Sequence, residues 1–231
     1  MFQAEMSDRL IADELQTHSA HATIGRQIIV LQQTSSTNDA ILAAATTNSN
    51  QGLVLFAEHQ IAGRGQRGNR WESAAGKGLW LSVLLRPGIQ IDESGRLTIW
   101  AIEAVSDIIR TKFSLEPGIK LPNDVRLSGR KVAGVLVEMR AQEKAPHLAV
   151  VGIGINVNQC RNDFPAELQD RAVSLAMALG RQVDRQNFAV ALLRNLDLTY
   201  RQKFSKAVVA SNSSPAPTTT RDKRAAKSPT V

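Results

Sequence analysis

Residues 119–139 read IKLPNDVRLSGRKVAGVLVEM, and this stretch decides the fold. It predicts a short strand, a corner at 122–124, and two longer strands joined by a hairpin that turns at Ser128 and Gly129. The run HLAVVGIGINVN at 147–158 predicts a further, strongly apolar strand. Because neighbouring strands here can pair through hairpins, we expect an α+β fold with a mixed β-sheet covered by helices, and not a doubly wound parallel sheet.

The flanking sequence supplies the remaining elements. Apolar runs predict strands at 27–33, 53–59 and 79–85, and helical spacing predicts helices at 36–45, 97–113 and 184–204. A short amphipathic helix is expected over 5–18. Residues 205–231 lack apolar periodicity and are rich in Ser, Thr, Pro, Ala and basic residues, so we expect them to be disordered. The predicted organisation is a helical N-terminal extension at 1–27, one main domain at 28–204, and a disordered basic tail at 205–231.

Composition narrows the class of protein. The chain has 231 residues, 43% of them hydrophobic, which is enough for one sizeable globular core. More than half of the net charge of +7 lies in 205–231, so the main domain is nearly balanced and suits an acidic or phosphorylated partner without requiring DNA. No run is long and apolar enough for a membrane helix or a secretory signal, and we expect a cytoplasmic protein. Cys160 is the only cysteine, which excludes an internal disulfide and a cysteine-based zinc site.

A glycine- and arginine-rich loop is expected after the strand at 53–59. Residues 62–71 read AGRGQRGNRW. They match neither the dinucleotide fingerprint, since no helical pattern follows, nor a Walker A loop, which ends in GK[ST]. Backbone amides and guanidinium groups in such a loop can close over an anion, and Trp71 would cover an aromatic ring or anchor the loop.

Five segments in a fixed order resemble the biotin protein ligases: SSTND at 35–39, AEHQIAGRGQRGNRW at 57–71, KLPNDV at 120–125, GRKVAGVLVE at 129–138 and GIGINVN at 152–158. The resemblance covers 28–200 and implies the catalytic domain of that family, with its class II aminoacyl-tRNA synthetase-like fold. It implies a ligase that uses ATP and Mg²⁺ to convert biotin into biotinyl-5'-AMP. The biotin would then pass to one lysine of a biotin carboxyl carrier protein, such as that of acetyl-CoA carboxylase.

The resemblance also implies roles for individual residues. Lys131 and Arg64 would be catalytic, and Arg64 would contact the phosphate. The implied biotin-binding residues are Ser36, Thr37, Asn38, Gln60, Arg64, Gly65, Gln66, Lys131 and Gly134. The implied ATP- and adenylate-binding residues are Arg64, Arg67, Trp71, Lys120, Asn123, Asp124 and Asn156, with Gly152 and Gly154 letting the strand approach the adenylate. No metal ligands are implied.

The chain departs from the family pattern at two positions. Gln66 stands where many relatives carry an arginine, and Leu121 replaces the tryptophan of the family's lysine-tryptophan-proline-asparagine-aspartate block. The first change removes a cation beside the activated acyl phosphate, for which Arg67 and Arg70 could compensate. The second alters packing beside the nucleotide.

Simpler interpretations of single motifs stay open at this point. Ser36 or Thr37 could serve only as a helix cap, and Arg67 and Arg70 could be solvated loop charges. Lys131 could be an edge charge, the segment 122–124 an ordinary turn, and 152–158 a buried strand with a glycine bulge.

Several alternatives concern the whole protein. Neither the C-terminal β domain nor the N-terminal winged helix of some relatives is expected, so we predict an enzyme without DNA binding. The rivals are a lipoate or octanoate ligase, a non-catalytic biotin-binding protein and, on the basic tail alone, a nucleic-acid-binding protein. A homodimer remains possible, because relatives often dimerise through sheet edges.

Overall fold

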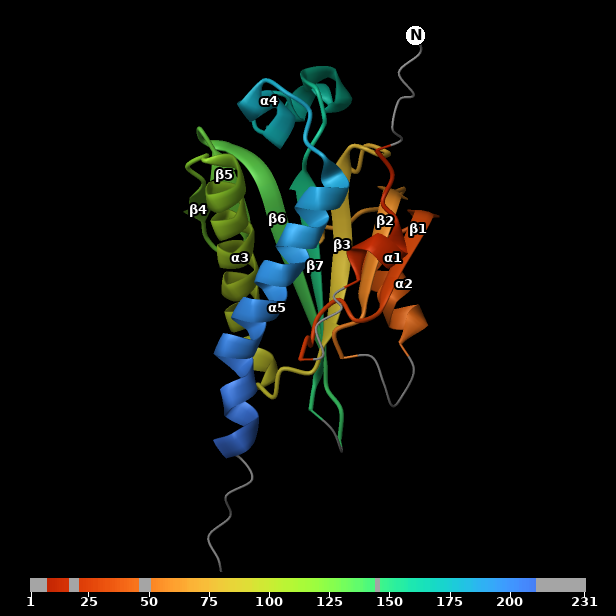
Figure 1. Ribbon diagram of the computed structural model, residues 1–231, viewed down its shortest axis with the longest axis vertical. Coiled ribbons are helices and arrows are strands. Elements are labelled where there is room, and N and C mark those ends of the chain that lie inside the picture. The colour runs from red at the N-terminus through yellow and green to blue at the C-terminus, as the bar shows by residue number, and fades with distance from the viewer. Residues whose placement is uncertain (1–7, 17–20, 46–50, 144–145, 211–231) are drawn as a thin grey trace, which may run out of the picture.

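A seven-stranded mixed sheet forms the centre of the molecule (Figure 1). The computed structural model describes residues 8–16, 21–45, 51–143 and 146–210. The strand order is β1-β2-β3-β7-β6-β5-β4, with β1 and β2 parallel and every other neighbouring pair antiparallel. The predicted mixed α+β sheet is therefore confirmed.

The strands are β1 Ile28–Thr34, β2 Val54–Gln60, β3 Gly78–Leu85, β4 Gly118–Lys120, β5 Asp124–Leu127, β6 Arg130–Arg140 and β7 Leu148–Asn156. The helices are α1 Ala12–Leu15, α2 Thr37–Ala44, α3 Gly95–Phe113, α4 Leu175–Leu179 and α5 Arg185–Ala210. Short 3-10 turns lie at η1 Gln66–Gly68, η2 Ile91–Ser94, η3 Arg161–Asp163 and η4 Ala166–Leu168.

The hairpin that decides the fold turns where the sequence places it. Ser128 and Gly129 have φ of 47° and 79°, and two consecutive positive φ angles are what a two-residue hairpin turn needs. The turn pairs β5 with β6 and brings Asp124 and Arg126 opposite Gly134 and Lys131. One predicted turn therefore fixes which side chains of two motifs become neighbours.

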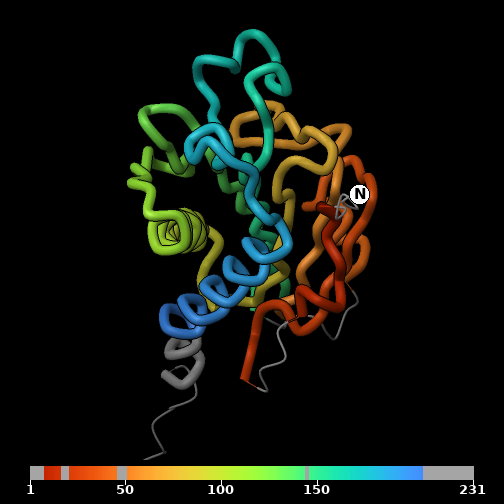
Figure 2. The backbone as a smooth tube through the Cα atoms, turned by 45° about the horizontal axis from the view of Figure 1, so that its top comes forward, coloured from red at the N-terminus to blue at the C-terminus, as the bar shows by residue number. Residues whose placement is uncertain are grey.

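Helices cover both faces of the sheet, because strand side chains alternate between the two faces. α3 and α5 pack on one face over the main core, where Leu79, Leu81 and Val83 of β3 are buried (Figures 1 and 2). α2 packs on the opposite face, where Ile41 contacts a smaller apolar cluster that includes Leu55 and Leu84. Beyond this cluster the same face carries three glycines and Ser82 between Trp80 and Leu136, and there the candidate site lies.

A buried arginine joins segments that are far apart in the sequence. The Arg185 side chain, at the start of α5, is 0% exposed and donates to Glu58 Oε2 at 2.7 Å and to the Gly78 carbonyl at 3.1 Å. Its other donors reach the carboxylate and the carbonyl oxygen of Asp8. Glu58 lies in β2 and Gly78 begins β3, so Arg185 holds together the two stems of the loop 61–77.

Two expectations about the chain ends are wrong in part. The helix expected over 5–18 is only α1, since Asp8–Ile11 are non-helical and the Leu10 and Ile11 amides donate to Glu58 and Gln186 instead. Residues 1–7 and 17–20 lie outside the described ranges. Residues 205–210 continue α5, since Lys206, Ala207 and Ala210 are good helix formers and the next proline comes only at 215. Residues 211–231 of the expected disordered tail lie outside the described ranges. Among the described helices, none combines the length and the apolar character that a bilayer span needs.

Candidate active site

The floor of the site consists of two rows of residues that run across the sheet. Cross-strand pairing places Gly134, Gly154 and Trp80 in one row, and Leu136, Gly152 and Ser82 in the next. The three glycine positions leave the middle of this face without side chains. A Cβ at Gly152 would lie 2.3 Å from Asn38 Oδ1, so the helix α2 can approach the sheet only because glycine stands there.

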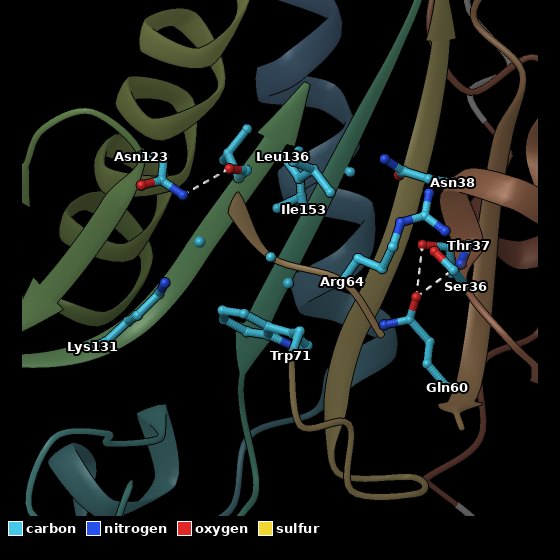
Figure 3. A pocket seen from close by; sticks show the side chains of 15 residues that line it. Ser36, Thr37, Asn38, Gln60, Arg64, Trp71, Asn123, Lys131, Leu136 and Ile153 are labelled. Atoms are coloured by element: carbon cyan, nitrogen blue, oxygen red, sulfur yellow. Dashed lines mark hydrogen bonds between the residues drawn. The ribbon is translucent and has the colours of Figure 1, made fainter. Parts of the chain in front are cut away.

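Buried polar side chains form one end of a first cavity (Figure 3). Thr37 donates its amide and its hydroxyl to Gln60 Oε1 at 2.8 and 3.1 Å, and Gln60 Nε2 donates to Ser73 at 3.0 Å. The Ser82 hydroxyl lies 2.8 Å from Thr37 Oγ1 and 2.6 Å from Asn38 Oδ1. This network fixes side-chain orientations before any ligand arrives, which lowers the ordering cost of binding.

The capping interpretation of the serine-threonine-asparagine motif does not hold. Ser36 occupies the N-cap position of α2, but its side chain makes no capping hydrogen bond. The first amide of the helix, on Thr37, is satisfied by Gln60 from β2. Ser36, Thr37 and Asn38 are all buried and their side chains form one wall of the first cavity.

The loop residue Arg64 lies at the rim of the first cavity between two carboxylates. Its guanidinium forms two hydrogen bonds with Asp39, one of them at 2.9 Å, and lies 3.1–3.2 Å from both oxygens of Glu138. The hydrogen bond to Asp39, together with the negative charge of Glu138, raises the pKa of Arg64 above its ordinary value. Glu138 also accepts from Asn38 Nδ2 at 2.6 Å.

Trp71 lies flat over the glycine floor. A Cβ at Gly154 or Gly134 would meet its ring at 2.5 or 2.8 Å. Lys131 Nζ is 5.0 Å from the ring centroid, a cation–π distance, and the buried indole Nε1 has no hydrogen-bond partner among the described residues. Trp71 thus fills the space above Gly134 and Gly154, and the cavity that remains measures about 40 Å³.

Lys131 projects from β6 and is held on both its side chain and its backbone. Nζ lies 2.6 Å from Asp124 Oδ1, and Asp124 is also 3.5 Å from Arg126. The Lys131 amide donates to the Arg171 carbonyl at 2.8 Å, and its carbonyl accepts from Val173 at 3.0 Å. Lys131 is half-buried and ion-paired, and β6 lies inside the sheet between β7 and β5, so the simpler interpretation as a solvated edge charge is wrong.

A second cavity of about 510 Å³ adjoins the first. The two cavities share Gly65, Trp71, Asn123 and Lys131. Six basic residues line the second one, namely Arg67, Arg70, Lys120, Arg126, Lys131 and Arg171, against the acidic Glu72 and Asp124. Such an excess of cations suits a polyanionic ligand of nucleotide size.

The structure divides the predicted residues between these cavities. Ser36, Thr37, Asn38, Gln60, Arg64, Gly134, Gly152 and Gly154 line the first cavity only. Gln66, Arg67, Lys120, Asp124 and Asn156 line the second only, together with the altered Leu121. Arg64 and Lys131 meet at the first cavity. Gln66 does not line that cavity, unlike its neighbour Gly65.

Three predicted residues have contacts within the protein that shape the walls. Asn156 Nδ2 donates to the Val173 carbonyl at 3.2 Å and to the Lys131 carbonyl at 3.4 Å. Asn123 Nδ2 donates to the Val135 carbonyl at 3.0 Å, so the corner at 122–124 is tied to β6 and is more than an ordinary turn. Arg70 is exposed and paired with Glu72 at 3.0 Å, as the solvated-charge interpretation expects.

Sequence reasoning missed two groups of residues. Asp39 and Glu138 fall inside the motifs SSTND and GRKVAGVLVE, and this position is the only hint in the sequence that they belong to the site. Nothing in the sequence predicts that both would pair with Arg64. Phe164, Leu168, Arg171 and Ala172 form a wall of the second cavity and come from a segment without a periodic pattern. Lys77 anchors this segment through both oxygens of Asp163 at 2.6 Å.

Comparison with known proteins agrees with this geometry. The model of the biotin/lipoate A/B protein ligase family matches residues 30–156. The bifunctional ligase/repressor BirA of Bacillus subtilis (strain 168) is 38% identical over 178 residues, which are 77% of this chain and 55% of that protein. The biotin--[acetyl-CoA-carboxylase] ligase of Mycobacterium tuberculosis is 38% identical over 177 residues, 74% of this chain and 63% of that protein. This chain thus spans only somewhat more than half the length of these relatives.

A solved structure shows the same fold. Biotin protein ligase from Aquifex aeolicus in complex with biotin and ATP superposes with a TM-score of 0.67 and 31% sequence identity. The match covers 78% of this chain and 73% of that one.

Proposed function

Because this chain belongs to the biotin/lipoate A/B protein ligase family, we propose that it activates biotin with ATP and transfers it to a lysine of a carrier protein. The observation that carries the proposal is the meeting of two cavities at Lys131. One has a buried polar end and the other is basic and of nucleotide size, as two substrates that must react with each other require. The named relatives favour biotin over lipoate.

The polar end of the first cavity would receive the ureido head of biotin. Ser36, Thr37, Asn38 and Gln60 offer hydroxyl and amide groups there, already oriented by Ser73 and Ser82. The vitamin's acyl chain would then lie over the glycine floor toward Lys131, so Trp71 has to shift from that floor. Gly65 and Arg64 would close over the chain from the loop.

The second cavity would hold ATP. Lys120, Arg67 and Arg171 supply positive charge around it, and Phe164 and Leu168 supply apolar walls for the base. A carboxylate oxygen of biotin attacks the α-phosphorus, the bond to the β-phosphate oxygen breaks, and pyrophosphate leaves. The carrier lysine nitrogen then attacks the acyl carbon, AMP leaves with the bonding electrons, and the nitrogen loses its proton.

Lys131 would be the principal electrostatic catalyst of both steps. Its ammonium lies where the two cavities join, and Asp124 fixes it from one side. Negative charge grows on the phosphoryl oxygens in the first step and on the acyl oxygen in the second. A fixed cation at that point stabilises both transition states, and losing one such donor typically costs about 10²- to 10³-fold in rate.

The triphosphate of ATP would bring Mg²⁺ into the second cavity. Magnesium in nucleotide sites is usually held by phosphate oxygens, several waters and only one or two protein carboxylates. Glu72 and Asp124 are the carboxylates that line this cavity.

A transfer assay tests the function. The protein is incubated with biotin, ATP and a carrier domain, and pyrophosphate release and the mass of the carrier are followed for wild type, Lys131→Ala and, as a control, Lys203→Ala. Lys203 pairs with Glu103 on the outer surface of α5 and α3, so its loss should change neither readout. We expect Lys131→Ala to lower the rate about 10²-fold or more.

Each rival predicts a different result, either in this assay or in a separate binding measurement. Binding of biotin without pyrophosphate release would show a binding protein and overturn the enzyme. A lipoyl adduct in place of a biotinyl one would show that the substrate is lipoate and not biotin. Retention on DNA at low salt would contradict the expected absence of DNA binding.

A further inference from the structure

The solvent-exposed side chains around Arg64 carry an inference of their own. Arg64 donates to both oxygens of Asp39, and its Nη2 lies 3.2 and 3.1 Å from the two oxygens of Glu138. Asp39 comes from α2 and Glu138 from β6, so the loop is attached to the two walls that flank the first cavity. The guanidinium is thus hydrogen-bonded to two of the protein's own carboxylates.

The charges in this cluster oppose an incoming anion. One guanidinium and two carboxylates leave a net charge of about −1 at the rim. A ligand carboxylate or phosphate oxygen would meet repulsion from Asp39 and Glu138 while Arg64 remains between them. Arg64 can offer a paired contact to the ligand's anion only by giving up at least part of its contact with these two residues.

The size of the first cavity agrees with this requirement. With Arg64 and Trp71 in their present positions it measures about 40 Å³, whereas small-molecule sites typically hold about 300–1,000 Å³. Both side chains belong to the loop 61–77 and must move for a ligand to enter. Breaking the Arg64 contacts is therefore part of the binding reaction.

We propose that Asp39 and Glu138 are positioning residues that compete with the ligand's anion for Arg64, so that the arginine exchanges the two carboxylates for the ligand when the loop opens and recloses. This inference rests on the proposed function, because it takes the ligand to be biotin or ATP. Glu138 has a second role in the exchange, since it also holds the amide of Asn38 at 2.6 Å and so links the loop to the polar end of the cavity.

The sign of a mutational effect tests the exchange. Asp39→Asn removes one competing charge but keeps the shape of the side chain, so biotin or ATP should bind more tightly and associate faster. Contacts between exposed charges are weak, so we expect a decrease in Kd of about two- to fivefold. Isothermal titration with biotin alone and with ATP alone distinguishes a carboxylate from a phosphate as the anion. Glu103→Gln is the matched control, because Glu103 is similarly exposed and ion-paired but lies on α3.

A second substitution shows whether the effect passes through Arg64. In an Arg64→Gln background the Asp39→Asn change should alter Kd by less than about 1.5-fold, because no guanidinium remains to be released. Unchanged or weaker binding of both ligands by Asp39→Asn would overturn the exchange. Weaker binding would mean that the carboxylates keep Arg64 in place over a bound ligand.

Proteolysis provides a readout that needs no ligand. Asp39→Asn should speed tryptic cleavage after Arg67 and Arg70 in the loop, whereas Glu103→Gln should leave it unchanged. If wild type binds neither biotin nor ATP, the proposed function fails and the exchange with it, even though faster cleavage would still show that Asp39 holds the loop. If wild type binds but Asp39→Asn changes neither affinity nor cleavage, only the exchange fails.

Discussion

Single glycines decide how closely Trp71 can lie to the sheet. A methyl group at position 154 would come within 2.5 Å of the indole, so we expect Gly154→Ala to displace the ring and to destabilise the protein by about 1–3 kcal/mol through overpacking. Urea unfolding followed by circular dichroism measures the change. Gly118→Ala is the control, since a Cβ there would meet nothing within 4 Å. Trp71→Phe should relieve much of the cost at 154; an additive double variant would contradict the contact.

The carboxylate of Asp124 matters through its neighbour. It lies 2.6 Å from Lys131 Nζ. Because Asp124→Asn removes this ion pair, we expect the Lys131 ammonium to lose its fixed position at the junction of the cavities. Charge-assisted hydrogen bonds are worth about 1.5–3 kcal/mol when buried, and this pair is partly exposed, so the loss in kcat should be about five- to tenfold. Steady-state transfer kinetics measure it, with Asp170→Asn as the control because Asp170 pairs with Arg161 on the surface. A rise in the KM for ATP at constant kcat would instead make Asp124 a ligand contact.

Among the elements, the segment 159–173 depends on an ion pair at its start. Burial works against ionisation of Asp163, but hydrogen bonds from Lys77 and from the Cys160 amide hold the pKa of its carboxyl below the usual value. A carboxyl with a lowered pKa in the folded state stabilises the protein above its unfolded pKa of about 3.9, and this contribution disappears as the pH falls through the folded pKa.

Asp163→Asn should therefore cost about 0.5–1 kcal/mol at pH 7, where the pair is partly screened by solvent, and progressively less below about pH 4. Urea unfolding of wild type and variant between pH 7 and pH 3 checks this. A difference that stays constant over that range would mean that the pair is held by shape and not by charge.

Elements with a clear period could be predicted and the others could not. β3 and β7 carry continuous apolar runs, and α3 repeats Ile102, Val105 and Ile109 toward the core, so local sequence and burial agree. The segment between β7 and α4 folds into the short turns η3 and η4, whose shape comes from contacts such as Lys77 with Asp163 that no local pattern records. The helix expected over 5–18 failed for the same reason, since Glu58 and Gln186 bind its backbone from far along the chain.

Among the substitutions considered, loss of the Arg185 side chain should lower the free energy of unfolding the most. Arg185→Met would leave Glu58 buried without its partner and should destabilise the protein by about 3–5 kcal/mol. Thermal and urea unfolding measure the loss. The double variant Arg185→Met with Glu58→Gln should recover part of it, because no unpaired charge is then buried. Costs that simply add would show that packing, and not charge, accounts for the effect.

The molecule as a whole also limits what a sequence can predict about a site. The motifs placed Arg64 and Lys131 at a common cavity, because the resemblance fixed both positions on one fold. The division into two cavities came only from side-chain positions, above all from Trp71 over Gly134 and Gly154. That glycines make room for the protein's own tryptophan, and not only for a ligand, is a property of packing across strands.

The walls shared by the two cavities have a thermodynamic consequence. Gly65, Trp71, Asn123 and Lys131 contact whatever fills either cavity, so occupancy of one changes the free energy of filling the other. Linkage requires this coupling to be reciprocal: under the proposed function, whatever factor ATP applies to the dissociation constant of biotin, biotin applies to that of ATP. Two ligands that meet at Lys131 therefore do not bind independently. The factor by which each changes the dissociation constant of the other reports how far these four residues rearrange.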